Sequence, residues 1–202
     1  DVVLFDKTGT LTAGRPTVTA VEPAPGQDAD QVLAWAAAAE SGSEHPLAKS
    51  IVAAAVAKGL AVPAASDFTS SPAVGVSATV AGATVRVGGP RLLTEQHATP
   101  LPIGERWADE GAIILHVLRG DQVVGALRLA DEIRPESRQA VEALHRLGVQ
   151  VGMITGDAEA VAATVAAELG IDHVIAGVRP EDKAGRVAEL QRQGRTVAMV
   201  GD

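Results

Sequence analysis

The sequence predicts a doubly wound α/β domain on a parallel sheet, with an antiparallel α+β domain inserted into it. Three short apolar runs that end in Gly, Asp or Thr have the form of buried parallel strands: residues 2–6, 149–157 and 196–202. Helical patterns separate these runs. The middle of the chain instead contains paired strands beside two Ala-rich helices, which indicates an antiparallel sheet.

Helices are expected around the parallel strands at residues 135–147, 157–169 and 180–193. The first begins with Pro and is followed by Gly148, while Gly170 and Gly194 follow the other two. Proline at a helix start and glycine after its end are the usual boundary signals. Because the carboxyl ends of parallel strands share one edge of a sheet, we expect the three Asp-bearing strand ends to meet there.

The insertion is predicted to span residues 18–128, which leaves 1–17 and 129–202 for the α/β domain. Its expected elements are helices at 28–40 and 46–58, a hairpin at 76–87 around Ala81-Gly82, and a hairpin with strands 113–118 and 123–129. Residues 22–26, rich in Ala and Pro, are expected to form a connecting loop.

Composition excludes several classes of protein. Hydrophobic residues make up 47% of the 202 residues, which is enough for a real core. The net charge of −8 and the 2% aromatic content argue against nucleic acid as a partner. The chain has no cysteine for disulfides or thiolate metal sites, and no apolar run is long enough to span a membrane. Because it begins inside one apolar run and ends directly after another, we expect a piece of a longer protein, with the α/β domain truncated at its C-terminus.

The run Asp-Lys-Thr-Gly-Thr-Leu-Thr, which starts at Asp6, is the strongest chemical signal. A carboxylate at a strand end before a Gly-containing turn is a candidate nucleophile, and the amides of such a turn suit a phosphate. Lys7 would balance charge, and the Thr8 carbonyl would suit a hard cation. A single Asp at a strand end is more often a turn or cap residue, but a seven-residue run is far more specific.

Polar residues at the other strand ends form a second candidate group, namely Thr155-Gly156-Asp157, Pro180-Glu181-Asp182-Lys183 and Val200-Gly201-Asp202. Taken alone, Thr155 and Asp157 are explained equally well as caps. Lys183 is explained equally well as a solvated lysine, although a cation near a helix N-terminus is slightly unfavourable.

The run from Asp6 is identical to the phosphorylation motif of the P-type ATPases, and the other motifs fall in that family's order, so the chain resembles the family over its whole length. The resemblance implies a haloacid-dehalogenase-like fold in which Asp6 forms an aspartyl-phosphate. It also implies Mg²⁺ held by Asp6, the Thr8 carbonyl and Asp202. Thr155 and Lys183 would contact the phosphoryl oxygens, and Lys7, Gly156 and Asp157 complete the implied catalytic set. The chain stops before the Asn-Asp pair that the family places just after Asp202.

The run Ser43-Glu44-His45-Pro46-Leu47 resembles the mark of the heavy-metal-transporting subclass of these ATPases. The resemblance implies that His45 orients the adenine ring of ATP with assistance from Glu40. Taken alone, a His before Pro is usually an exposed residue at a helix start, and Glu40 would be a solvated helix end.

The resemblance also places Gly75 and Gly88 near the nucleotide, although both would serve equally well as ordinary turn glycines. Two positions depart from the subclass pattern. Ala73 replaces the first Gly of a Gly-x-Gly turn, and Gly89 replaces an Asn. If position 73 needs a positive φ, Ala would be strained there. Both departures predict weaker or altered nucleotide binding.

The expected function is therefore the cytoplasmic, ATP-binding and autophosphorylating part of a heavy-metal pump of the cell membrane. Its expected partners are ATP, the transmembrane and actuator domains of the same chain, and a metal ion bound outside this segment. Similarity in the stretch from Pro180 to Asp202 favours copper(I) over zinc, cadmium or lead. Phosphatases of the wider superfamily carry a second Asp where this chain has Thr8, so the phospho-aspartate should persist here. A soluble phosphatase or phosphotransferase, and a nucleotide-binding module without catalysis, stay open as alternatives.

Overall fold

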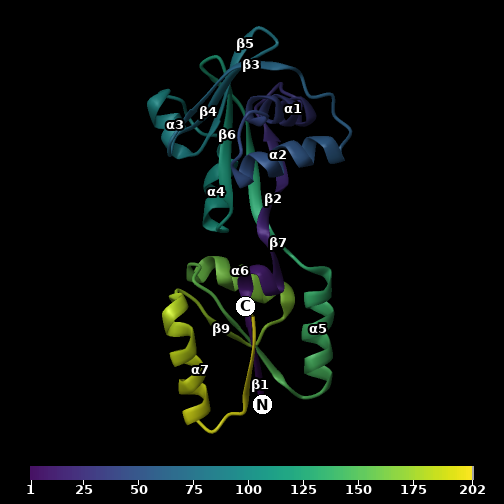
Figure 1. Cartoon of the computed structure of the whole chain (residues 1–202), viewed down its shortest axis with the longest axis vertical. Coiled ribbons are helices and arrows are strands. Elements are labelled where there is room, and N and C mark those ends of the chain that lie inside the picture. The colour runs from purple at the N-terminus through teal and green to yellow at the C-terminus, as the bar shows by residue number, and fades with distance from the viewer. Residues whose placement is uncertain (202) are drawn as a thin grey trace. The chain divides into compact units, whose positions relative to one another are not determined.

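The computed structural model describes residues 1–201, apart from the side chain of Pro180. The chain divides into two compact units. One, called here the α/β unit, consists of Asp1–Arg15 and Asp131–Asp202. The other, called the inserted unit, consists of Pro16–Ala130. Each unit has a sheet and helices of its own (Figure 1).

The α/β unit is built on a parallel sheet with strand order β10-β1-β8-β9. The strands are β1 (Val2–Asp6), β8 (Gln150–Ile154), β9 (His173–Ile175) and β10 (Val197–Val200). Val2 of β1 lies opposite Gln150 on one side and Val197 on the other. The sheet therefore places the end of β1, with Asp6, between the ends of two neighbouring strands.

Helices cover both faces of this sheet. They are α5 (Pro135–Arg146), α6 (Glu159–Leu169) and α7 (Lys183–Arg192), the last preceded by a short 3₁₀ turn, η2 (Pro180–Asp182). Phe5 of β1 packs in one core cluster with residues of α5 and α6, including Val141 and Ala162. Its neighbour Leu4 packs in another with Val187 and Leu190 of α7. The alternation of side chains along β1 thus serves two helical layers, which confirms the doubly wound arrangement.

The inserted unit is built on a six-stranded sheet with strand order β2-β7-β6-β5-β4-β3. The strands are β2 (Thr12–Pro23), β3 (Ala65–Ser71), β4 (Gly75–Val80), β5 (Ala83–Gly88), β6 (Ile113–Arg119) and β7 (Gln122–Ile133). Neighbours from β3 to β7 pair antiparallel, and both expected hairpins, β4–β5 and β6–β7, are present.

The helices of the inserted unit pack on this sheet in two groups: α1 (Ala29–Glu40) and α2 (Pro46–Ala57) in one, α3 (Pro90–Glu95) and α4 (Ile103–Asp109) in the other. The helices α1 and α2 share a core cluster with strand residues such as Val85 and Leu127. Ala36, Ala37, Ala38 and Ala39 of α1 are fully buried, so the Ala-rich sequence allows close packing on the sheet. On α3, Leu92 packs with Leu118 of β6.

Several elements differ from the expectations. The helix expected from residue 157 begins at Glu159, and the loop expected at 22–26 is wrong for Glu22 and Pro23, which belong to β2. Pro at the end of an edge strand lacks only a hydrogen bond that the edge does not need. The sequence did not predict β2, β3, β9, α3 or α4, because these elements are short or lack a hydrophobic period.

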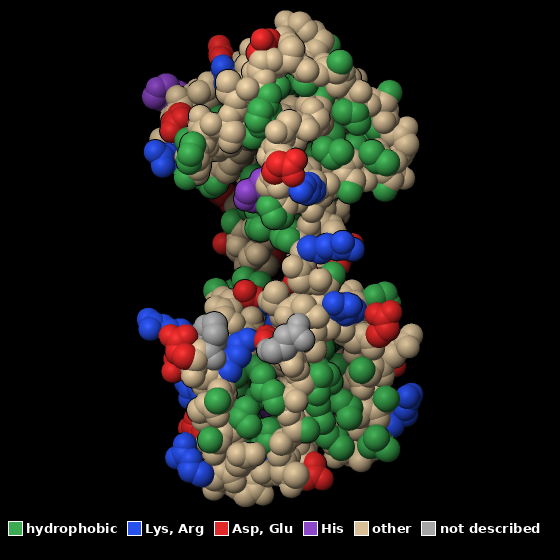
Figure 2. Space-filling view, in the orientation of Figure 1, with side chains coloured by type: hydrophobic (Ala, Val, Ile, Leu, Met, Phe, Trp, Pro, Cys, Tyr) green, Lys and Arg blue, Asp and Glu red, His purple; other side chains and the backbone are tan. Residues whose placement is uncertain are grey.

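The surface mixes charge and apolar area. Figure 2 shows side chains of both signs interspersed on the face in view, together with a broad hydrophobic area on the α/β unit. The edge strand β10 adds exposed Met199 and Val200 to the surface of this unit. Within the described residues, every helix is too short or too polar to cross a membrane.

Candidate functional site

Asp6 is the last residue of β1, and the following segment η1 (Lys7–Leu11) turns the chain sharply. Thr8 has φ −75° and ψ 124°, and Gly9 has φ 82° and ψ −17°, which are the angles of a type II turn. That turn needs a residue with positive φ at its third position, which explains Gly9. Thr8 is exposed at the turn, whereas Lys7 is buried.

Two residues from the start of α5 fix this turn. The Arg134 guanidinium donates Nε–H to the Thr12 carbonyl and a terminal N–H to the Gly9 carbonyl, both at 3.0 Å. The Ser137 hydroxyl donates to the Leu11 carbonyl at 2.9 Å. Sequence reasoning did not select Arg134 or Ser137. The available signal was their place beside Pro135, the first residue of the helix expected at 135–147.

The Asp6 carboxylate is held by Lys183, the first residue of α7. Lys183 Nζ lies 2.6 Å from Asp6 Oδ2, and the two side chains are 22% and 14% exposed. Gly201 lies against the same aspartate, because a Cβ at position 201 would lie 2.8 Å from Asp6 Cβ. Asp6, the candidate nucleophile, therefore lies between Lys183 and Gly201, and the missing side chain at Gly201 leaves room for it.

A second ion pair lies beside the first. Lys7 Nζ is 2.9 Å from Asp157 Oδ2 and 3.8 Å from Asp131 Oδ2. Asp131 also accepts hydrogen bonds from the Thr12 hydroxyl and, at 3.1 Å, from the Arg15 amide. Lys7 is only 6% exposed, so two carboxylates compensate its buried charge.

The turn after β8 brings three predicted residues to the same edge of the sheet. Thr155 is buried, and its hydroxyl oxygen accepts the amide N–H of Asp157 at 3.1 Å. Ala158 occupies the N-cap position of α6, so the alternative interpretation of Asp157 as the helix cap is wrong. Gly156 lies between them and is exposed. Asp202, the third expected magnesium ligand, lies outside the described residues.

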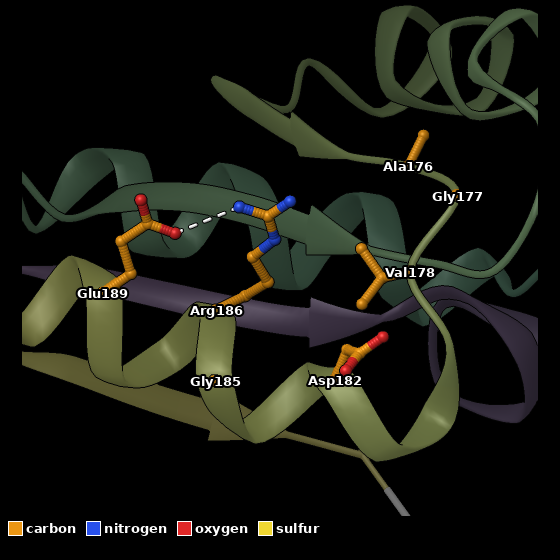
Figure 3. Close-up of a pocket in the computed structure, with 7 residues that line it drawn as sticks. All are labelled: Ala176, Gly177, Val178, Asp182, Gly185, Arg186 and Glu189. Atoms are coloured by element: carbon orange, nitrogen blue, oxygen red, sulfur yellow. Dashed lines mark hydrogen bonds and ion pairs between the residues drawn. The ribbon is translucent and has the colours of Figure 1, made fainter.

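A pocket of about 350 Å³ opens on the α/β unit beside α7 (Figure 3). Its lining is Ala176, Gly177, Val178, Asp182, Gly185, Arg186 and Glu189. Arg186 and Glu189 form an ion pair with each other at 3.0 Å along the helix. Asp182 is the one member of the second candidate group in this lining, and the implied catalytic and magnesium-binding residues are not part of it. The candidate site is therefore defined by the strand ends rather than by this cavity.

In the inserted unit, Glu40 is the last residue of α1 and His45 directly precedes α2. Glu40 is only 6% exposed, so the interpretation of a solvated helix end is wrong. Burial raises the pKa of its carboxyl to about 7, partly opposed by a hydrogen bond from Ser43. His45 is the N-cap residue of α2, and its Nδ1 accepts the Leu47 amide at 3.2 Å. The neutral ring therefore carries its proton on Nε2, on an exposed side chain.

Gly75 and Gly88 face each other across the β4–β5 pair. A Cβ on Gly75 would lie 2.1 Å from the Val87 carbonyl oxygen, and a Cβ on Gly88 would lie 2.1 Å from the Val74 carbonyl oxygen. Gly75 also has φ +147°. Both glycines are therefore required by the packing of the two backbones, whether or not a nucleotide approaches them.

The departure at Ala73 has a visible cost. The Val74 amide donates to the Ser71 carbonyl at 3.1 Å and closes a turn in which Pro72 and Ala73 are the central residues. Ala73 has φ +61°, in the left-handed region that favours glycine. The position does need a positive φ, so the alanine is strained. A side chain at Gly89, the other departure, would meet open space.

The comparison with protein families identifies the class. The family model of haloacid dehalogenase-like hydrolases matches residues 1–202, and the chain belongs to this family. The parallel sheet with an acidic residue at the end of β1 and the helices on both faces agree with that assignment.

The relatives that match over the whole chain have more specific names than the family. The chain is 47% identical over 207 residues to "Probable copper-exporting P-type ATPase V" of Mycobacterium tuberculosis. The matched region covers 100% of this chain and 27% of that protein. It is 41% identical to copper-transporting ATPase 1 of Rhizobium meliloti, covering 100% and 25%. The chain thus spans about a quarter of the length of these curated relatives.

Solved structures agree with this assignment. A zinc-transporting PIB-type ATPase in its E2.Pi state has a TM-score of 0.87 and 38% identity, covering 99% of this chain and 32% of that chain. The catalytic domain of the CPx-ATPase CopB-B, described with its conformational changes upon nucleotide binding, has a TM-score of 0.67 and 27% identity. The match covers 100% of this chain and 71% of that chain.

Proposed function

We propose that this chain is the ATP-binding and autophosphorylating part of a heavy-metal P-type ATPase, with Asp6 as the phosphate acceptor. The observation that carries this proposal is the contact between Asp6 Oδ2 and Lys183 Nζ at the carboxyl end of β1. A nucleophilic carboxylate needs a nearby cation to approach a charged phosphate, and Lys183 supplies one.

In the proposed step, an Asp6 carboxylate oxygen attacks the γ-phosphorus of ATP. The bond between the γ-phosphorus and the bridging oxygen breaks, and ADP leaves with the electron pair. Lys183 stays beside the acceptor and offsets the added negative charge, while Thr155 follows the neighbouring strand β8 at the same edge of the sheet. Lys7 is engaged with Asp131 and Asp157, so we assign it to holding the turn rather than to the phosphate.

The oxygen-rich residues of this edge fit Mg²⁺. Asp6 Oδ1 and the Thr8 carbonyl are hard donors of the kind that Mg²⁺ prefers, and Asp202 follows β10 in the sequence. We propose these three as its ligands. Bound there, the ion would neutralise charge on the transferred phosphoryl group.

The position of Thr8 favours a stable phospho-aspartate over a phosphatase cycle. Thr8, the third residue of the motif, is exposed. It provides no carboxylate that could activate water for attack on the acyl-phosphate. The family name includes hydrolases, so the soluble phosphotransferase is the competing function that experiment has to separate.

For the nucleotide, we propose the inserted unit. His45 Nε2–H is an exposed donor suited to a ring nitrogen of adenine, because Nδ1 is occupied by the Leu47 amide. Glu40, buried with a raised pKa, would face the exocyclic amino group. Gly75 and Gly88 leave the paired backbones of β4 and β5 without side chains, and we propose that the nucleotide approaches the backbone there.

We propose copper(I) as the transported ion, on the similarity to copper ATPases of Mycobacterium tuberculosis and Rhizobium meliloti. The same part is also similar in fold to a zinc-transporting ATPase, so the preference for copper(I) rests on sequence similarity rather than on the fold. The ion would bind in transmembrane domains outside this chain, with an actuator domain as a further partner. The chain would then lie on the cytoplasmic side of the cell membrane.

The test is phosphorylation of the full-length protein that carries this chain by γ-labelled ATP with Mg²⁺. We expect acid-stable, hydroxylamine-labile label that disappears in Asp6→Asn and is stimulated by copper(I). Absence of label in the wild type would overturn the acceptor role. Rapid, Asp6-dependent hydrolysis of p-nitrophenyl phosphate without trapped label would favour the soluble phosphotransferase instead.

A further inference from the structure

A groove follows the edge of the parallel sheet at which β9 is the last strand. It consists of two adjoining pockets, the one of about 350 Å³ beside α7 (Figure 3) and a second of about 530 Å³. Both are lined by Ala176, Gly177 and Arg186, and the second also reaches Glu159 of α6 and Val174 of β9. The groove therefore lies along an edge strand, between helices that cover opposite faces of the sheet.

The edge of β9 is open to a further strand. Among the described strands, β9 pairs with β8 alone. The Thr155 amide donates to the Ile175 carbonyl at 3.0 Å, so Ile175 faces the sheet and Val174 directs its amide and carbonyl to the open side. Natural edge strands commonly carry Pro, Lys or a bulge that blocks such pairing. The edge strand β2 contains Pro16 and Pro23, whereas the sequence of β9 is His-Val-Ile and its register is regular.

The packing of the unit does not explain a glycine inside α7. Gly185 is the third residue of this helix, where glycine is less stable than alanine. An ideal Cβ built on Gly185 would meet no atom within 4 Å, so the fold has room for a side chain. Gly185 lies on the groove side of α7 with Asp182, Arg186 and Glu189 (Figure 3). The bare helix surface at this position allows another backbone to approach closely.

Backbone hydrogen bonds hold the floor of the groove in place. The Gly177 amide donates to the Asp157 carbonyl at 2.9 Å, and the Val178 amide donates to the Thr155 carbonyl at 3.0 Å. The chain after β9 is thereby tied to the turn after β8. An occupant would meet a preformed surface, which lowers the entropic cost of binding.

The charge of the groove is predominantly negative. Its lining contains the carboxylates of Glu159, Asp182 and Glu189 and the guanidinium of Arg186. Arg186 is paired with Glu189 at 3.0 Å, and the ion pairs of the described residues include neither Glu159 nor Asp182. A segment that carries Lys or Arg would complement these two carboxylates.

We propose that the groove along β9 is a docking site for an extended, basic segment of a partner protein, which adds a strand to β9. The main chain of the segment would pair with the outward amide and carbonyl of Val174, and this mode of recognition depends little on sequence. Its backbone would pass close to α7 at Gly185, and its basic side chains would meet Glu159 and Asp182. The groove contains neither Asp6 nor the nucleotide candidates, so this inference does not rest on the proposed function.

The experiment measures binding of a fluorescein-labelled heptapeptide of alternating Lys and Val to the chain by fluorescence anisotropy, without ATP. Salt of about 0.15 M limits attraction by the net charge alone. We expect the wild type to bind this peptide, and to bind the same peptide with Glu in place of each Lys at least about tenfold more weakly.

Two variants at Val174 test the strand addition. Val174→Pro removes the outward amide and keeps the bonds to β8, since proline is tolerated on an edge strand. It should bind the Lys-Val peptide about tenfold more weakly, because a hydrogen bond is lost and the ring blocks the edge. Val174→Thr retains the amide and the branched side chain, and it should bind like the wild type.

Two variants of α7 test the close approach of the backbone. Gly185→Leu introduces a good helix former that fills the groove, so the melting temperature should not fall, while the peptide should bind about tenfold more weakly. Ala184→Leu, at an exposed position of the same helix outside the groove lining, is the matched control and should bind like the wild type.

The outcomes decide each part of the inference. A wild type that does not bind the Lys-Val peptide would overturn the docking site, and equal binding of the Glu peptide would overturn the basic occupant. Binding by Val174→Pro within about twofold of the wild type would overturn the strand addition. If Val174→Pro has a lowered melting temperature, Gly185→Leu decides: weakened binding at an unchanged melting temperature supports the site, and retained binding overturns it.

Discussion

Lys7 Nζ lies 2.9 Å from Asp157 Oδ2 and joins the residue after β1 to the turn after β8. The contact is an ion pair without hydrogen-bond alignment at that oxygen, and Asp131 flanks the ammonium at 3.8 Å. Lys7 is 6% exposed, whereas the Asp157 side chain is 35% exposed. The buried cation therefore keeps two carboxylates close together at the edge of the sheet that also carries Asp6.

Replacing Lys7 by Met should lower the free energy of unfolding by roughly 3 kcal/mol, because two neighbouring carboxylates would lose their compensating charge. Urea denaturation followed by circular dichroism measures this. Lys58→Met is the matched control, since Lys58 and Asp30 form an ion pair in which both side chains are 53% exposed. That variant should lose less than about 1 kcal/mol. Equal losses in the two variants would contradict a structural role for Lys7.

The local motifs of the site could be predicted from the sequence, whereas the distant residues that hydrogen-bond to them could not. Asp6, Lys7 and Thr8 are adjacent, and the parallel-strand pattern predicted that Thr155 and Asp157 would reach the same edge. Arg134 and Ser137 lie 125 and 126 residues from the turn carbonyls that they bind, and no short-range pattern encodes such contacts. The burial of Glu40 was missed for the same reason, because the tertiary packing around the end of α1 decides it rather than the helix pattern.

Ala73→Gly should stabilise the inserted unit by about 1 kcal/mol, because glycine adopts the left-handed conformation at φ +61° without a Cβ clash. Thermal unfolding of the chain monitors the change. The same substitution at Ala53, exposed within α2, should instead destabilise by about 1 kcal/mol. Loss of stability in Ala73→Gly would show that the turn does not strain the alanine.

Glu40 predicts a stability that decreases as pH rises. Burial raises its pKa from 4.5 to about 7, so between these values the folded state binds a proton that the unfolded state has released. The contribution is complete below pH 4.5 and is lost as pH rises through 7. The difference in melting temperature between wild type and Glu40→Gln should therefore grow between pH 5 and 8, with the variant the more stable at pH 8. A constant difference would exclude a raised pKa.

His116 predicts a stability that decreases as pH falls, which is opposite to the effect of Glu40. It is 4% exposed, its Nδ1 is buried without a hydrogen bond, and desolvation lowers its pKa. As pH falls below 6.5, the unfolded state takes up a proton that the folded state resists, so stability is lost. His116→Leu, which removes the unpaired nitrogen, should be no less stable at pH 8 and more stable than the wild type at pH 5. If the two proteins lose stability in parallel on acidification, His116 is not the cause.

Gly201→Ala should impair phosphorylation far more than stability. The new methyl would lie 2.8 Å from Asp6 Cβ, which is closer than two carbons tolerate, so Asp6 or β10 has to move. Gly201 is exposed and follows the edge strand β10, so the backbone can yield at little cost to folding. The same movement would displace Asp6 from its contact with Lys183. Phosphorylation is sensitive to this displacement, because about 1 Å at a reacting atom costs on the order of a hundredfold in rate. The initial rate of labelling by γ-labelled ATP measures this loss, and Gly194→Ala, with open space around its Cβ and φ +81°, controls for backbone strain alone. Normal labelling in Gly201→Ala would mean that the position of the Asp6 carboxylate does not depend on this contact.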